Sequence, residues 1–351
     1  MTDRLERLRD RVDAPLLVTN LTNVFYLTGF ESSNAALVVD PGGRDGDGGD
    51  RLYTDFRYIE AAQATPGVEA VLTKRALLRD LAERLDGRLA FEADALPYSQ
   101  YQVLADAGID LVPTTGVVEG LRAVKDDGEL AKIRRAARAA ERAFEALTAE
   151  TWVGRTEKDA AWRLRQLMHA HGADEVSFPT HVASGPNASL PHSEPTDKVI
   201  ETRSFVLADF GAKIDGYCSD CTRTLATGPL PKELRRMYDV CREAQEAAVA
   251  EIKAGMTGVD ADAVARRIID EAGYGDKFGH GLGHGVGLEI HEAPRLSTES
   301  GDTLEAGNVV TIEPGIYAPG LGGVRIEDLA VVRDDGVELL TSFPKDLITV
   351  S

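Results

Sequence analysis

Four carboxylates and one imidazole, each in strand-like sequence of the C-terminal half, restrict how this chain can fold more than any other feature. They are Asp209, Asp220, His284, Glu313 and Glu327. Asp209 and Glu313 each end an apolar run, and a charge placed there is costly unless it is paired or bound to a metal. Together the five supply oxygen-rich ligation for two divalent cations, and such a pair activates water for hydrolysis. We therefore expect the fold to gather them into one metal site.

The turns between these residues indicate hairpins. Glycine-containing turn sequence separates Asp209 from Asp220, and the segment APGLGG lies between Glu313 and Glu327. Both arrangements are typical of neighbouring antiparallel strands. Because strands hold side chains more rigidly than loops do, this placement suits a two-metal site.

A glycine-rich segment, GHGLGHGVGLEIHE at 279–292, contributes three of the seven histidines of the chain: His280, His284 and His291. It contains no HExxH pair, and its glycines do not fit the dinucleotide fingerprint. The chain also lacks a phosphate-binding GxxxxGK[ST] loop and a GxSxG nucleophile elbow. With these motifs excluded, we interpret the segment as a strand or turn that is loosened by glycine and holds imidazole side chains in a site.

The 351 residues are expected to form two domains. The first third alternates strand and helix signals and predicts an α/β domain. A long amphipathic helix begins near residue 128, so the boundary is placed near Lys125, giving domains 1–124 and 125–351. The second domain is predicted to contain helices and strands at the following positions: helices at 128–150, 157–171, 231–254 and 260–272, and strand-rich sequence at 175–226 and from 273 to the end.

Composition excludes several functions. The formal net charge of −19 makes nucleic acid an unexpected partner, because no basic footprint is present. No apolar run is long enough for a membrane span, and the charged N-terminus lacks the apolar core of a signal peptide. We expect a cytoplasmic protein. The acidic composition fits a high-salt cytoplasm and a GC-rich genome equally well.

The cysteines are not expected to have a chemical role. Three cysteines do not make a disulfide framework. Cys218 and Cys221 form a CxxC around Asp220, but no second CxxC completes a zinc knuckle. We expect neither a redox nor a zinc function for this pair.

Five motifs together resemble the creatinase/methionine-aminopeptidase ("pita-bread") superfamily, and within it the Xaa-Pro peptidases. They are DFGA, GYCSDCTRT, GHGLGHGVGLEIHE, TIEPGIY and GGVRIED, in the order of that family. The N-terminal segments NLTNVFYLTGF and LYTDFRY are similar to the creatinase-type N-terminal domain. The resemblance implies an α/β (α+β) protein, with a creatinase-like domain followed by a pita-bread catalytic domain whose antiparallel sheet is flanked by helices.

The resemblance also implies a function. All five candidate ligands match the family's ligand positions, with Asp220 and Glu327 bridging two metals and water activated between them attacking the bond before proline. The ligand types favour Mn²⁺, with Co²⁺ or Zn²⁺ as alternatives. Glu313 matches the family's general base. The expected substrates are peptides with proline in second position, and the expected assembly is a homodimer.

Three further residues match the family's active site. His192 and His291 correspond to histidines that stabilise the oxyanion. Arg325 corresponds to an arginine at the edge of the site, and either orients Asp209 or meets the substrate carboxylate. Arg295 is a second candidate for that carboxylate.

Four other residues near the motifs are expected to have supporting roles. His181 and His280 are interpreted as neighbours of the site, and Tyr217 and Tyr317 as packing residues.

Two subtypes stay open: a dipeptidase that recognises the carboxylate after proline, and an aminopeptidase P that leaves room for a longer chain. Methionine aminopeptidase is disfavoured by the N-terminal domain, and metal-free creatinase by the complete ligand set. A non-catalytic binding protein would be expected to have lost ligands.

Overall fold

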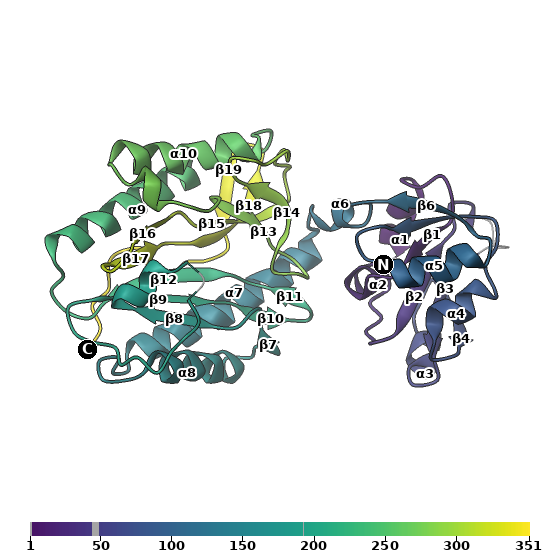
Figure 1. Ribbon diagram of the computed structural model, residues 1–351, viewed down its shortest axis with the longest axis horizontal. Coiled ribbons are helices and arrows are strands. Elements are labelled where there is room, and N and C mark those ends of the chain that lie inside the picture. Colours follow the sequence, from purple (N-terminus) through teal and green to yellow (C-terminus); the bar gives the residue numbers. More distant parts are fainter. Residues whose placement is uncertain (1, 44–48, 192) are drawn as a thin grey trace. The chain divides into compact units, whose positions relative to one another are not determined.

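The computed structural model describes residues 2–43, 49–191 and 193–351. The chain forms two compact units, Met1–Arg122 and Ala123–Ser351 (Figure 1). No helix among the described residues is long and apolar enough to cross a membrane.

The N-terminal unit is built on a six-stranded mixed sheet in the order β4-β3-β2-β1-β5-β6. Its strands are β1 (Leu16–Val18), β2 (Ala35–Val39), β3 (Arg51–Asp55), β4 (Glu69–Thr73), β5 (Arg88–Glu92) and β6 (Asp110–Thr114). Its helices are α1 (Thr2–Arg9), α2 (Leu21–Thr28), α3 (Ile59–Gln63), α4 (Leu77–Ala82), α5 (Tyr98–Asp106) and α6 (Glu119–Arg122). Local sequence sets some of these bounds: Asn20 caps the start of α2, and Gly29 ends it at a φ of 72°.

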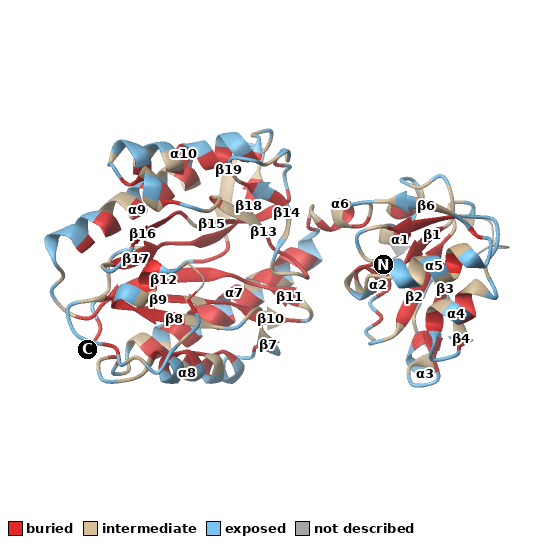
Figure 2. Cartoon of the chain, viewed as in Figure 1, coloured by how far each residue is buried: buried red, intermediate tan, exposed pale blue. Residues whose placement is uncertain are grey.

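Four long helices flank the sheets of the C-terminal unit: α7 (Asp127–Thr148), α8 (Glu157–Ala170), α9 (Lys232–Glu251) and α10 (Gly258–Glu271). A capping box between Asp126 and Glu129 starts α7. The faces of these helices that turn toward the sheets are buried, and their outer faces are exposed (Figure 2). One apolar core lies beneath α7 and α8 and a second beneath α9 and α10.

The strands of this unit form two three-stranded sheets (β11-β10-β7 and β12-β9-β8), a five-stranded sheet (β14-β13-β15-β18-β19) and the hairpin β16-β17. The first group is β7 (Glu175–Val176), β8 (His181–Ser184), β9 (Phe205–Phe210), β10 (Ala212–Ile214), β11 (Tyr217–Cys218) and β12 (Cys221–Ala226). The second group is β13 (Gly283–Gly285), β14 (Glu292–Leu296), β15 (Val309–Ile312), β16 (Gly315–Ala318), β17 (Gly322–Arg325), β18 (Asp328–Arg333) and β19 (Gly336–Leu339). All their pairings are antiparallel. The predicted fold class is confirmed.

Candidate metal centre

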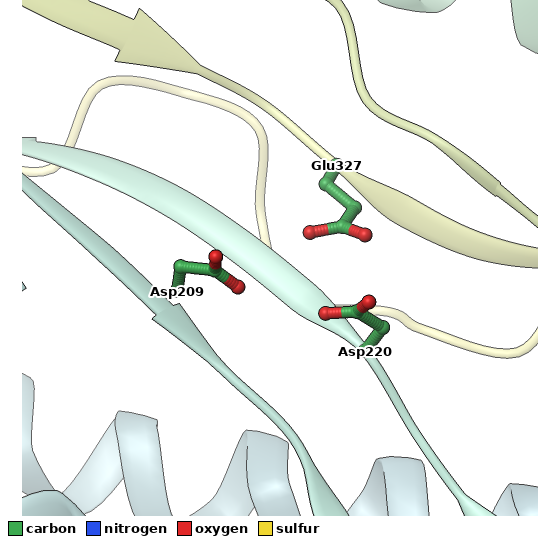
Figure 3. A group of neighbouring side chains, drawn as sticks. All are labelled: Asp209, Asp220 and Glu327. Carbon is green, nitrogen blue, oxygen red and sulfur yellow. The ribbon is translucent and has the colours of Figure 1, made fainter. Parts of the chain in front are cut away.

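Three carboxylates converge where strands from different sheets end. Asp209 lies near the end of β9, and Asp220 directly precedes β12, the strand that pairs with β9. Glu327 lies between β17 and β18. One carboxylate oxygen from each of the three lies within 4.8 Å of the others, and Figure 3 shows the three carboxylates close together. Asp220 and Glu327 are buried, whereas Asp209 is partly exposed.

His284 and Glu313 adjoin this group. His284 Nε2 lies 3.2 Å from Glu313 Oε1 and 3.7 Å from Asp220 Oδ2. The Thr311 hydroxyl donates to Glu313 Oε1 at 2.9 Å and accepts from the His284 backbone N–H at 3.0 Å. Only glycine fits at position 283, because a Cβ there would clash with the Thr311 carbonyl. This glycine lets β13 and β15 approach closely enough to bring the two ligand candidates together.

Arg325 connects the carboxylates. Its Nη2 donates to Asp209 Oδ2 at 2.6 Å, and its Nε donates to Thr222 Oγ1 at 2.9 Å. Thr222 in turn donates to Glu327 Oε2 at 2.7 Å. The guanidinium therefore orients Asp209 directly and Glu327 through a hydroxyl. Thr222 could not be predicted from the sequence, because a threonine in a buried strand is ordinary.

Tyr317 belongs to the same network, which goes beyond the packing role expected for it. Arg325 Nη1 donates to its hydroxyl at 2.9 Å, and His280 Nε2 lies 2.9 Å from the same oxygen. His280 Nδ1 lies 2.7 Å from the Gly281 carbonyl oxygen, which only accepts, so Nε2 of the neutral ring is an acceptor and the phenol proton points to it. Burial raises the pKa of Tyr317 to about 12, so the phenol stays protonated at neutral pH.

The remaining predicted residues are placed differently. The His291 ring lies 4.4 Å from that of His284 and is exposed. His192 lies outside the described residues. Arg295 is exposed, and no hydrogen bond or ion pair joins its side chain to the carboxylates in the described part of the chain. Tyr217 donates to Glu129 Oε1 at 2.8 Å, at the start of α7.

Both cysteines of the CxxC are buried and free. Burial raises the pKa of Cys218 to about 11 and also raises the pKa of Cys221. Both therefore stay protonated at neutral pH, the unreactive form of a thiol.

The acids of the cluster differ in the direction in which their pKa values are shifted. Burial, followed by repulsion from neighbouring carboxylates, raises the pKa values of Asp220 and Glu327 well above their ordinary range. Burial also acts to raise the pKa of Glu313, but the hydrogen bond and charge of His284 outweigh it and lower the value to about 2. Asp220 and Glu327 are therefore the acids that most need a cation to ionise.

The residues fit a divalent metal. Asp220 Oδ1 and Glu327 Oε1 are inaccessible to solvent, and neither has a hydrogen-bond partner among the described residues. A buried carboxylate oxygen without a partner is expensive, and a cation between such oxygens satisfies both. Carboxylates with a single imidazole suit Mn²⁺ and similar ions better than thiolate-seeking metals.

Two family models match this chain, one in each part of it. Residues 131–334 match the model of Metallopeptidase family M24, and residues 4–124 match that of the Creatinase/Prolidase N-terminal domain. An uncharacterized peptidase of Bacillus subtilis, YqhT, is 42% identical over 98% of this chain and 99% of its own length.

Two solved structures are also similar along nearly their whole length. A Xaa-Pro dipeptidase from Bacillus anthracis has a TM-score of 0.94 and 41% identity, with 99% of each chain covered. An X-Pro aminopeptidase from Thermotoga maritima has a TM-score of 0.88 and 34% identity, with 98% of this chain and 100% of the other covered.

Proposed function

Since the chain belongs to metallopeptidase family M24, we propose that it cleaves the bond between an N-terminal residue and a following proline. The family makes it a metallopeptidase that acts on peptides with divalent metal. Proline specificity is supported by the dipeptidase and aminopeptidase named above, which are similar to this chain over almost its full length. Because the two differ in subtype, dipeptidase and aminopeptidase P both remain candidates.

The metal site is proposed to hold two cations, with Mn²⁺ preferred over Co²⁺ or Zn²⁺. Its proposed ligands are Asp209, Asp220, His284, Glu313 and Glu327. The observation that carries this proposal is a pair of buried oxygens on Asp220 and Glu327, the two residues expected to bridge, which have no hydrogen-bond partner among the described residues. When bound, the cations supply water activated for attack and polarise the substrate carbonyl.

The side chains around the metal site are proposed to have different roles in the reaction. Glu313, which lies 3.2 Å from His284 Nε2, is proposed to accept the proton of the attacking water. His291, exposed beside His284, and His192 are proposed to stabilise the oxyanion. Arg325 holds Asp209 in position at 2.6 Å.

We also propose a creatinase-like domain over residues 1–124, a catalytic domain over 125–351, and a cytoplasmic homodimer. The family matches at 4–124 and 131–334 support the division. Light scattering of the purified protein tests the dimer.

The test compares the Mn²⁺-loaded protein on Ala-Pro and Ala-Pro-Ala. Hydrolysis of the dipeptide alone identifies a dipeptidase, and efficient hydrolysis of the tripeptide identifies an aminopeptidase P. Failure to cleave either peptide at full metal occupancy would overturn the proposal. Asp220→Asn is expected to lose metal and at least about 100-fold in activity. Asp215→Asn, a change at an exposed aspartate nearby, is expected to keep both.

A further inference from the structure

His181 lies directly opposite Asp209 across the β8–β9 pair. Facing residues of antiparallel strands project from the same side of the sheet. The next pair on the same side of the sheet is Ala183 and Leu207, which pack against Tyr317 of the metal centre. The pair between them, Val182 and Ala208, projects from the opposite side and belongs to the core beneath α7 and α8. His181 therefore projects from the face of the sheet that carries the metal centre.

The imidazole is held in one orientation. His181 Nδ1 lies 3.1 Å from the Ser193 carbonyl oxygen, and its ring stacks on Phe178 with the centroids 6.2 Å apart. A carbonyl only accepts, so Nδ1 carries the ring proton and Nε2 of the neutral ring is an acceptor. No further hydrogen bond of this side chain is present within residues 2–43, 49–191 and 193–351. The side chain is also only partly buried, so a ligand can reach it.

The proposed substrate has few hydrogen-bond donors that His181 Nε2 could accept from. In a Xaa-Pro dipeptide the scissile nitrogen belongs to proline and carries no hydrogen. The only backbone N–H donors left are those of the N-terminal ammonium. We propose that His181 Nε2 accepts a hydrogen bond from this ammonium and so positions the first residue beside Asp209. This inference rests on the proposed Xaa-Pro activity.

The experiment compares two ligands that differ only at the amine. Kinetics with Ala-Pro give kcat and KM, and N-propionyl-proline, which lacks the amine, gives an inhibition constant against Ala-Pro. His181→Ala is expected to raise the KM for Ala-Pro about 10- to 100-fold, the effect of losing one hydrogen bond to a charged group. The inhibition constant of propionyl-proline should change less than about twofold, because that ligand never made this bond.

Two further variants support the comparison. His181→Gln keeps an acceptor and is expected to recover part of the affinity for Ala-Pro. His171→Ala removes an exposed histidine at the end of α8 and is expected to leave all constants unchanged.

Three outcomes overturn the inference. If both ligands weaken equally, His181 serves another part of the substrate; if neither weakens, it makes no contact. If His181→Ala loses bound metal, its role is to support Asp209. Wild-type protein that cleaves no Xaa-Pro peptide would overturn the proposed function first and this inference with it.

Discussion

In the metal centre, the hydroxyl of Thr222 lies between two charged groups. It accepts from Arg325 at 2.9 Å and donates to Glu327 at 2.7 Å, and it faces Asp209 across the β9–β12 pair. Hydrogen bonds of this kind fix the direction in which a ligand oxygen points. Thr222 therefore sets the position of Glu327 without meeting a cation itself.

Thr222→Val keeps the shape of the side chain and removes this link. We expect affinity for Mn²⁺ to fall by about tenfold or more, the usual effect of losing a group that orients a ligand. Titration with a competing metal indicator measures it. Thr224→Val is the matched control, because the Thr224 hydroxyl bonds to the Arg325 backbone and to no candidate ligand within the described part of the chain. Equal affinities in the two variants would contradict the role of Thr222.

The charged ligand candidates could be predicted from the sequence alone, but the side chains that orient them could not. Asp209 and Glu313 are conspicuous because each ends an apolar run. Thr222 and Tyr317 are not, since a hydroxyl in a buried strand is common and only the strand pairing shows what it faces. His181 is also inconspicuous in the sequence, because only the register of the β8–β9 pair places it opposite Asp209.

At the scale of elements, a buried ion pair ties the segment before α7 to β14. Lys125 Nζ lies 3.1 Å from Glu292 Oε2, and the two side chains are 1% and 6% exposed. Glu292 Oε1 also accepts from the Glu289 backbone N–H at 3.1 Å, which closes the loop that carries His291. The pair therefore fixes the strand end next to an active-site candidate.

Breaking this pair should be costly. Lys125→Met removes the cation from a buried carboxylate, and we expect the free energy of unfolding to fall by about 3–5 kcal/mol. Adding Glu292→Met should restore part of the loss, because the buried carboxylate that lost its cation is then removed as well. Urea denaturation measures both. Arg135→Met, which breaks an exposed pair with Asp215, should cost no more than about 1 kcal/mol; a similar cost for Lys125→Met would refute the prediction.

Glu157, the first residue of α8, bonds to the end of β8 and to the segment that follows it, and its ionisation depends on pH. It is fully buried and accepts hydrogen bonds from Ser184 N at 2.7 Å and Thr196 Oγ1 at 2.6 Å, among others. Burial acts to raise its pKa, but these bonds outweigh burial and hold the pKa below the ordinary 4.5. The folded state therefore prefers the carboxylate, so the stabilisation is complete above that ordinary value and is lost as pH falls through the lower folded pKa.

We expect Glu157→Gln to lower the free energy of unfolding at pH 7 by about 1–3 kcal/mol, because an amide group faces donors that need an acceptor. The difference from wild type should shrink as pH falls below 4.5. Urea denaturation of both proteins along a pH series measures it. A difference that stays constant with pH would show that ionised Glu157 is not the cause.

Long helices were predictable at this scale and short strands were not. The helix predicted at 128–150 is confirmed as α7, Asp127–Thr148, because its capping box and apolar stripe are local signals. Strands of two or three residues, such as β7 and β11, exist only through their partners. Their bounds therefore depend on contacts that a sequence window does not contain.

For the molecule as a whole, bound metal should contribute to stability. Without a cation, buried carboxylates face one another and two of their oxygens lack partners among the described residues. A ligand present at 100 times its Kd stabilises a fold by about 2.7 kcal/mol.

Chelation of the Mn²⁺-loaded protein should therefore lower its Tm by about 5–10 °C for a unit of this size. Circular dichroism during heating, with and without chelator, measures the change. Asp220→Asn should show no such shift, since it lacks a central ligand. An equal Tm for loaded and chelated wild type would argue against the site.

The candidate ligands run from Asp209 to Glu327, and they come from two sheets that pair separately. A chain still emerging from the ribosome therefore lacks a complete set of candidate ligands until residue 327 has been made. Metal binding at the proposed site therefore has to follow the meeting of these distant strands. A product truncated before β18 would lack Glu327 or its support and is expected not to retain divalent metal. Metal content is thus expected to separate molecules that contain β18 from those truncated before it.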